Sequence, residues 1–193
     1  MIVRKAKIDD VNSICTLHQY AFDSNYFTST FSQKMLTNFY TMLLKNNNYN
    51  YIAVDDKDNP LGFIVAGYNT SATVNLFIKK NVISLSIILL KNPKFLSQRL
   101  KTFLRRNSSN EFISKAKLRL LAIGVKKDSE NKGIGTQLIQ YLDHDLIRNG
   151  ECIYGLSVKK NNTNAIKFYL KNNFKVEREE GNSIYYIKEI NVN

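Results

Sequence analysis

The sequence predicts a mixed α/β fold in which helices flank one central sheet of about six or seven strands. Strand-like segments alternate with segments whose apolar residues recur at helical spacing. Hydrophobic residues make up 44% of the 193 residues and charged residues 23%, which suits a packed core. The chain contains no internal repeat and no linker rich in Pro, Gly or Ser. We therefore expect a single domain over 1–193 that carries one insertion.

The first part of the chain is predicted to form a strand, two helices and a hairpin. Asp9 or Asp10 is expected to cap the first helix. The sequence KDNP supplies the turn of the hairpin. The expected strands lie at 2–8, 50–56 and 61–68, and the expected helices run from the cap to about Phe22 and over about 33–44.

Residues 72–112 are predicted to be a basic helical insertion before the fourth strand. Pro93 is expected to begin a helix there, because the first turn needs no N–H from that residue. No Asp or Glu occurs between Asn59 and Asn110. The net charge of the chain is +12, and this segment suits an anionic partner. Its basic residues are Lys79, Lys80, Lys91, Lys94, Arg99, Lys101, Arg105 and Arg106.

The last part of the chain alternates strands and helices. A glycine-rich loop follows the fourth strand, and Gly150 is expected to end the helix after that loop. The final hairpin is expected to turn at Gly181-Asn182. The expected strands are 117–125, 151–158, 174–180 and 183–190, and the expected helices end near 149 and 172.

Gly133 and Gly135 stand where this helix begins, which suggests that a ligand approaches the backbone. A helix N-terminus has unpaired N–H groups and a partial positive charge, and glycines allow these groups to close around a phosphate. Lys132 adds a cation and Thr136 a hydroxyl. The alternative is a glycine turn that only tightens the junction between strand and helix.

Two other kinds of phosphate loop are excluded by the residues present. A Walker A loop needs Lys followed by Ser or Thr after its second glycine, and this sequence has no such pair. A dinucleotide fingerprint needs a third glycine, but Leu138 stands at that position. It also needs an acidic residue at the end of the next strand, which ends in Ser157-Val158 instead.

Two motifs resemble those of the GCN5-related N-acetyltransferase (GNAT) family. The segment LLAIGVKKDSENKGIGTQLIQYL is similar to the family pattern of a strand, a turn and Q/R-x-x-G-x-G/A opening a helix. The segment NTNAIKFYLKNNF at 162–174 resembles the second family signature, Asn-x-x-Ala-x-x-x-Tyr-x-x-x-Gly-Phe. The resemblance covers about 1–68 and 113–190 and implies the GNAT fold. Glu130 at the Q/R position departs from the pattern, as does Asn173 before Phe174, although Asn tolerates a left-handed turn.

The resemblance implies acetyl-CoA as the acetyl donor. The glycine loop is then expected to bind the CoA pyrophosphate. The fourth strand is expected to separate from the fifth and to pair with the pantetheine arm, with a bulge at Gly124. An N–H near Ala122–Ile123 would face the thioester carbonyl. Asn162 either holds a CoA amide or only caps its helix. The expected donor-binding residues are Ile123, Gly124, Val125, Asn131, Lys132, Gly133, Ile134, Gly135, Thr136, Asn162 and Ala165.

Tyr169 is the catalytic residue that the resemblance implies. Its phenol can donate a proton or a hydrogen bond to the departing thiolate of CoA. Without the motif, Tyr169 would be interpreted as an aromatic residue packed in the core. The base stays unassigned among Glu111, Asp23, His18 and a chain of water molecules. The spacing of His18 favours a packed histidine with its hydrogen bonds satisfied, and His144 is expected on a solvated face.

The sequence does not determine the acceptor, although the basic insertion favours a small amine with an anionic group, such as an amino-sugar nucleotide. A protein or peptide N-terminus or a lysine is the alternative. Two other classes are a non-catalytic CoA-binding module and a nucleic-acid-binding module, although the sequence contains no motif typical of nucleic-acid recognition. A third is an interfacial helix at 82–106 that docks on anionic lipid. The insertion can also be a solvated cover over the cleft. Two Cys and two His without metal spacing predict no metal site. We expect a cytoplasmic monomer or homodimer.

Overall fold

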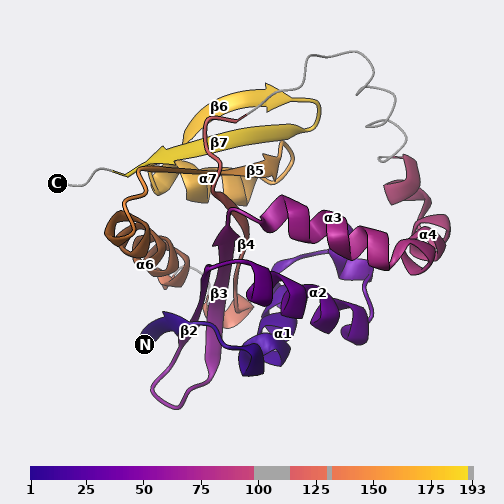
Figure 1. Ribbon diagram of the computed structural model, residues 1–193, viewed down its shortest axis with the longest axis horizontal. Helices are drawn as coiled ribbons and strands as arrows, with labels where there is room; N and C mark the ends of the chain where they lie inside the picture. The colour runs from indigo at the N-terminus through magenta and orange to yellow at the C-terminus, as the bar shows by residue number, and fades with distance from the viewer. Residues whose placement is uncertain (98–113, 130–131, 191–193) are drawn as a thin grey trace.

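A seven-stranded mixed sheet forms the centre of the computed structural model, which describes residues 1–97, 114–129 and 132–190. The strand order is β1-β2-β3-β4-β5-β7-β6 (Figure 1). Only β4 and β5 run parallel, and the other neighbours are antiparallel. The predicted fold class is confirmed. The strands are β1 (Ile2–Lys5), β2 (Tyr49–Val54), β3 (Pro60–Gly67), β4 (Arg119–Val125), β5 (Ile153–Lys159), β6 (Lys175–Glu180) and β7 (Ser183–Glu189).

The helices follow the predicted order. The described helices are α1 (Val11–Ala21), α2 (Gln33–Asn46), α3 (Thr70–Lys80), α4 (Val82–Lys91), α6 (Ile134–Arg148) and α7 (Thr163–Lys171). Short 3₁₀ turns are η1 (Ile8–Asp10), η2 (Phe27–Thr30) and η3 (Lys127–Ser129).

The start of α1 differs from the prediction. The first strand ends at Lys5, and η1 fills the space before α1. Asp10 does stand at the N-cap position of α1, but its side chain makes no capping bond to that helix. Instead its carboxylate accepts from the backbone N–H of Lys7 at 2.7 Å and from the Arg4 guanidinium at 2.8 Å. The carboxylate therefore holds the η1 turn against β1.

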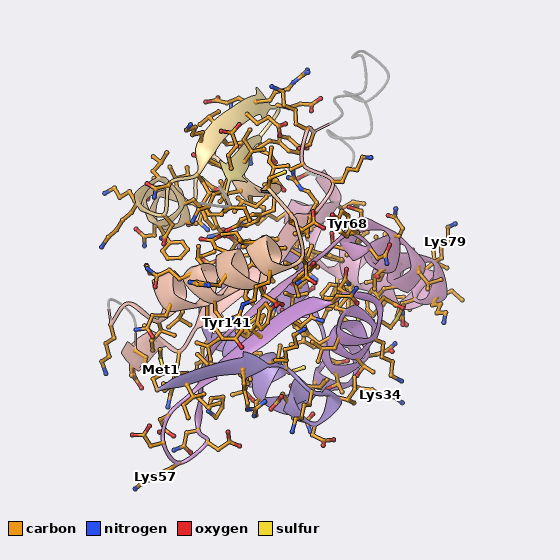
Figure 2. The ribbon with its side chains drawn as sticks, turned by 60° about the vertical axis from the view of Figure 1, so that its left-hand side comes forward. Met1, Lys34, Lys57, Tyr68, Lys79 and Tyr141 are labelled. Carbon is orange, nitrogen blue, oxygen red and sulfur yellow. The ribbon has the colours of Figure 1, made fainter. Side chains whose placement is uncertain are left out.

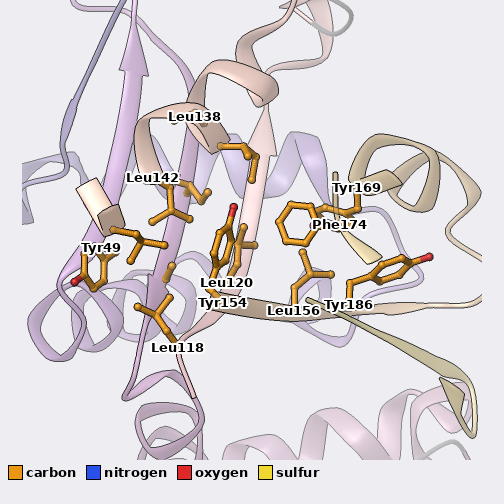
Figure 3. Packing of buried hydrophobic residues seen from close by; sticks show 14 of the residues in the cluster. Tyr49, Leu118, Leu120, Leu138, Leu142, Tyr154, Leu156, Tyr169, Phe174 and Tyr186 are labelled. Carbon is orange, nitrogen blue, oxygen red and sulfur yellow. The ribbon is translucent and has the colours of Figure 1, made fainter. Parts of the chain in front are cut away.

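Both faces of the sheet are covered, and the strands alternate their side chains between two cores. Tyr51 and Ile64 pack with α6 on one face, whereas Ile52 and Phe63 pack with α1 and α2 on the other. Figure 3 shows part of the first core, where Leu138 and Leu142 of α6 lie near Tyr154, and Tyr169 lies near Phe174.

The described part of the insertion belongs partly to the second core. Phe77 of α3 is buried, and its ring lies 5.0 Å from that of Phe39 and 5.8 Å from that of Phe31. Helix α3 therefore packs on the body of the protein through this ring, and the interpretation of the insertion as a solvated cover stays a prediction. Residues 93–97 are helical, as Pro93 predicts, while 98–113 lie outside the described residues.

No single helix among the described residues is long and apolar enough to cross a membrane. α3 and α4 meet that criterion only when they are taken together, and their axes are bent by 84°. The expected interfacial helix at 82–106 is also interrupted, because α4 ends at Lys91 and Asn92 is not helical.

Left-handed residues end two helices as the sequence predicts. Gly150 has φ 76° after α6, and the N–H of Glu151 donates to the carbonyl of Leu146 at 3.0 Å. This is the bonding of a Schellman cap. Asn173 has φ 66°, so it fills the place of the glycine that the family pattern has before Phe174.

Candidate active site

The opening between β4 and β5 is the central feature of the candidate site. These parallel strands pair at Arg119 and Gly155, and the N–H of Gly155 donates to the carbonyl of Leu118 at 3.0 Å. Both strands are fully described, and their ladder records no further pair toward Val125 or Lys159. The predicted separation of the two strands is confirmed.

The ladder between β3 and β4 determines which backbone groups face this opening. The N–H of Lys126 donates to the carbonyl of Leu61 at 2.8 Å on the β3 side. Alternate residues of an antiparallel strand direct their N–H groups to opposite sides. The N–H groups of Ile123 and Val125 therefore point away from β3, whereas that of Ala122 points toward it.

The expected bulge at Gly124 is wrong. Gly124 pairs in register with Phe63, and the register shifts further along, where Val65 pairs with Ala122 but Ala66 pairs with Leu120. Gly124 is needed for space instead. A Cβ at this position would lie 2.6 Å from the Phe63 ring, a distance that side chains do not tolerate.

The two glycines of the loop have different structural roles. Gly133 is the N-cap of α6 with φ 78°, and nothing lies within 4 Å of the position that its Cβ would take. A Cβ on Gly135 would lie 3.0 Å from the Phe168 ring and 3.7 Å from Val125. Gly135 thus allows α6, α7 and the end of β4 to meet. Lys132 is exposed, while Glu130 and Asn131 lie outside the described residues.

Asn162 caps α7 and also contacts the segment between α1 and α2. Its Oδ1 accepts the backbone N–H of Ala165 at 3.0 Å, which confirms the capping role. Its Nδ2 donates to the phenol oxygen of Tyr26. The amide of Asn162 therefore has a partner on each side.

Tyr169 lies on α7 and packs into the first core. It is 8% exposed, and its ring packs 5.3 Å from Phe168 and 5.4 Å from Phe174. Burial raises the pKa of its phenol well above the usual value, and the nearby Tyr26 raises that pKa further. Tyr169 is therefore a packed aromatic whose phenol stays protonated at neutral pH.

The segment between α1 and α2 brings residues to the site that the sequence did not single out. Lys94 donates from Nζ to Oδ1 of Asn25 at 2.7 Å, and Lys159 donates from Nζ to the backbone carbonyl of Asn25. The Lys159 ammonium also lies 5.2 Å from the centroid of the Tyr26 ring. Phe95 packs on Phe27 at 5.5 Å, which holds the insertion against this segment.

The pKa of Lys159 is lowered, mainly by burial and then by the charge of Lys94, while Asp23 acts in the opposite direction. The sequence offered one clue to this cluster, because Lys94 lies in the span without acidic residues. Tyr26 stands in the loop sequence FDSNYFTSTF, which carries no periodic signal.

The base candidates have very different surroundings. His18 is 2% exposed, its Nδ1 lies 2.7 Å from the Tyr40 hydroxyl, and burial lowers its pKa to about 4. Its Nε2 has no partner, so the expectation of satisfied hydrogen bonds is wrong for that atom. Asp23 is exposed and accepts from Asn25 at 2.9 Å. His144 is exposed as expected, and Glu111 lies outside the described residues.

A separate hollow of about 570 Å³ lies beside α6 and β1, away from Tyr169. Its walls include Val3, Gln137, Tyr141 and His144, and Figure 2 shows Tyr141 on this side of α6. Across the described ranges, no three His, Cys, Asp or Glu side chains gather in a way that could hold a metal ion.

Comparisons with known proteins agree with this geometry. Residues 17–174 match the model of the Acetyltransferase (GNAT) family. The PaiA N-acetyltransferase of Thermoplasma acidophilum, solved in complex with coenzyme A, is 18% identical with a TM-score of 0.61, covering 97% of this chain and 98% of that chain. SsHAT is 14% identical with a TM-score of 0.72, covering 98% of both chains.

A third similar structure is the ribosomal-protein-S18-alanine N-acetyltransferase of Escherichia coli. It is 14% identical with a TM-score of 0.57, and the match covers 100% of this chain and 95% of that chain. The search of curated proteins found no match. At these identities, the solved structures establish the fold.

Proposed function

Because the chain belongs to the GNAT family of acetyl-CoA-dependent acetyltransferases, we propose that it acetylates the primary amine of a small acceptor that carries an anionic group. The family match covers most of the chain and includes both signature segments.

The donor side is formed by the start of α6 and the free edge of β4. Gly133 leaves the N-terminus of α6 open, and the backbone from Lys132 to Thr136 would hold the CoA pyrophosphate there. The unpaired edge of β4, from Ile123 to Val125, offers hydrogen bonds to the amides of the pantetheine arm. Ala165 on the first turn of α7 would line the same channel.

The transfer needs one bond to form and one to break. The amine nitrogen attacks the thioester carbonyl carbon, and the C–S bond breaks as the C–N bond forms. The N–H of Ile123 would stabilise the charge that develops on the carbonyl oxygen. Tyr169 would give its phenolic proton to the departing thiolate. The amine loses a proton to solvent, and solvent returns a proton to the Tyr169 phenolate.

The two lysines at Asn25 support this acceptor class. Lys94 and Lys159 come from the insertion and from the end of β5, and both ammonium groups bind the same asparagine. Within the described ranges neither forms an ion pair with a carboxylate. Two neighbouring cations repel each other, and a bound anion offsets this repulsion. A phosphate or carboxylate on the acceptor would be such an anion, bound beside Tyr26 and Tyr169.

The test is a screen of amines in pairs that differ only in a phosphate group, with release of free CoA thiol as the readout. Amino-sugar nucleotides and amino-sugar phosphates come first, and peptides with free N-termini are included. We expect the phosphorylated member of a pair to be preferred. Preference for the uncharged amine, or for the peptides, would contradict the proposed acceptor class.

Variants then locate the anion. Lys94→Gln and Lys159→Gln should each raise KM for the anionic acceptor about tenfold or more, the effect of losing one charge-assisted hydrogen bond. KM for acetyl-CoA should not change. Lys34→Gln, an exposed residue on α2, is the matched control. An equal increase in KM for the charged and the uncharged acceptors would show that the lysines do not bind the anionic group.

A further inference from the structure

Helix α4 presents a row of aliphatic side chains to solvent. Ile83, Ile87 and Leu90 are 75%, 49% and 73% exposed, and their spacing of four and three residues places them on one face. Leu85 on the opposite face is the buried residue of this helix. Apolar residues so arranged on a solvent face indicate a surface that is covered in use.

This face is held in a fixed direction. Leu85 anchors α4 in the second core, and the preceding helix α3 is anchored there through Phe77. A single residue, Asn81, joins the two helices. Figure 1 shows α4 at the edge of the molecule, beyond α3 and away from α6. The row therefore projects from the body of the protein.

The charges beside the row are all positive. Lys79 and Lys80 stand in the last turn of α3, and Lys91 stands in the last turn of α4. All three are exposed, and Figure 2 shows Lys79 at the rim of the molecule. The sequence from Asn59 to Asn110 supplies no acidic residue to balance them.

We propose that the outer face of α4 docks on an anionic lipid surface, with the helix lying along the membrane plane. Ile83, Ile87 and Leu90 would enter the headgroup region, and the lysines at the ends of α3 and α4 would bind lipid phosphates. A second copy of this chain fits poorly, because its own lysines and its net charge of +12 would oppose the first. The inference is independent of the acceptor.

The experiment is co-sedimentation with vesicles of phosphatidylcholine containing phosphatidylglycerol, compared with phosphatidylcholine alone. The wild-type chain should bind the anionic vesicles at low salt, and added salt should weaken this binding. The Ile83→Ser/Ile87→Ser/Leu90→Ser variant should lose binding about tenfold or more. Lys79→Gln/Lys80→Gln/Lys91→Gln should lose about a hundredfold.

Matched controls separate docking from general effects. Leu170→Ser/Val176→Ser removes two aliphatic side chains of similar exposure elsewhere, 50% and 51%, and should bind as the wild type does. Acetyl-CoA binding by every variant confirms folding. No sedimentation at low salt would overturn the proposal, as would full binding by the serine variant. A wild-type dimer that this variant converts to a monomer would show that a second copy covers the face.

Discussion

The side-chain amide of Asn162 donates a hydrogen bond to the phenol oxygen of Tyr26, which joins the first residue before α7 to the segment between α1 and α2. The Tyr26 ring packs against Phe22 at 5.0 Å, and the Lys159 ammonium lies over it. Through this bond, the helix that carries Tyr169 and the segment that meets the insertion form one wall.

The bond predicts that Asn162→Ser separates two roles of this residue. Serine keeps an oxygen that can cap α7, but its shorter side chain has no second polar group to reach Tyr26. We expect the free energy of unfolding to change by less than about 0.5 kcal/mol, since Ser and Asn cap helices equally well. KM for the acceptor should rise, because the Tyr26 wall is released. Thermal unfolding and steady-state kinetics measure the two effects.

Two further variants check the assignment. Asn162→Ala removes the cap as well and should cost about 1 kcal/mol of stability. Tyr26→Phe removes the same hydrogen bond from the other side and should reproduce the kinetic effect of Asn162→Ser. If Tyr26→Phe leaves KM unchanged, the bond does not shape the acceptor side.

Tyr169→Phe should lower kcat about a hundredfold or more, because the departing thiolate loses its proton donor. KM for acetyl-CoA should stay close to that of the wild type, since the ring and its packing are retained. Release of free thiol at saturating acceptor measures the effect.

Tyr186→Phe is the control for this variant, because it makes the same change at a buried tyrosine of the same core. It should retain kcat. An equal loss of kcat in both variants would mean that a general disturbance of the core, rather than the missing proton donor, explains the result.

Gly133→Asp should abolish or greatly weaken acetyl-CoA binding. A carboxylate at the open N-terminus of α6 would occupy the place of the pyrophosphate and repel it. The chain should still fold, since nothing lies within 4 Å of the new Cβ and Asp tolerates a left-handed conformation. Calorimetry measures the binding.

Gly150→Asp controls for the strain and the charge of this variant. Gly150 has φ 76°, close to the 78° of Gly133, and its Cβ position is equally open, but it lies at the other end of α6. This variant should bind acetyl-CoA as the wild type does. Unchanged binding by Gly133→Asp would exclude the loop as the phosphate site.

His18 should make the protein less stable as pH falls from 6.5 toward 4. Burial lowers the pKa of His18 to about 4 from its ordinary 6.5. Between these values the unfolded chain binds a proton that the folded chain does not, so the free energy of unfolding decreases as pH falls and levels off below pH 4. The loss should be on the order of 3 kcal/mol.

Denaturant unfolding at several pH values measures this loss. His18→Gln should flatten the dependence in this window, whereas His144→Gln, which removes an exposed histidine, should leave it unchanged. A wild-type curve that is flat from pH 6.5 to 4 would mean that His18 titrates normally in the folded chain.

Much of the fold could be read from local patterns. The hairpins turn where Gly181-Asn182 and KDNP predict them, and Asn173 takes the left-handed conformation that its position before Phe174 requires. The separation of β4 from β5 followed from the family resemblance. Spacing and turn chemistry depend on neighbours in the chain, so the sequence shows them directly.

At Gly124 and Gly135, the sequence motif did not reveal the structural role of the glycine. Both glycines stand in the signature segment, but each is needed because an aromatic ring from a distant element lies against its backbone, Phe63 in one case and Phe168 in the other. A sequence motif records that a glycine is required, but it does not record whether a ligand or a side chain needs the space.

The sequence by itself determined the order of helices and strands, the family and the position of Tyr169. Only the tertiary structure decided that Asn25 and Tyr26 meet Lys94, Lys159 and Asn162. These contacts join segments that are far apart along the chain. Their partners are set by the order of strands in the sheet and by the packing of the insertion through Phe95, and neither leaves a periodic pattern in the local sequence.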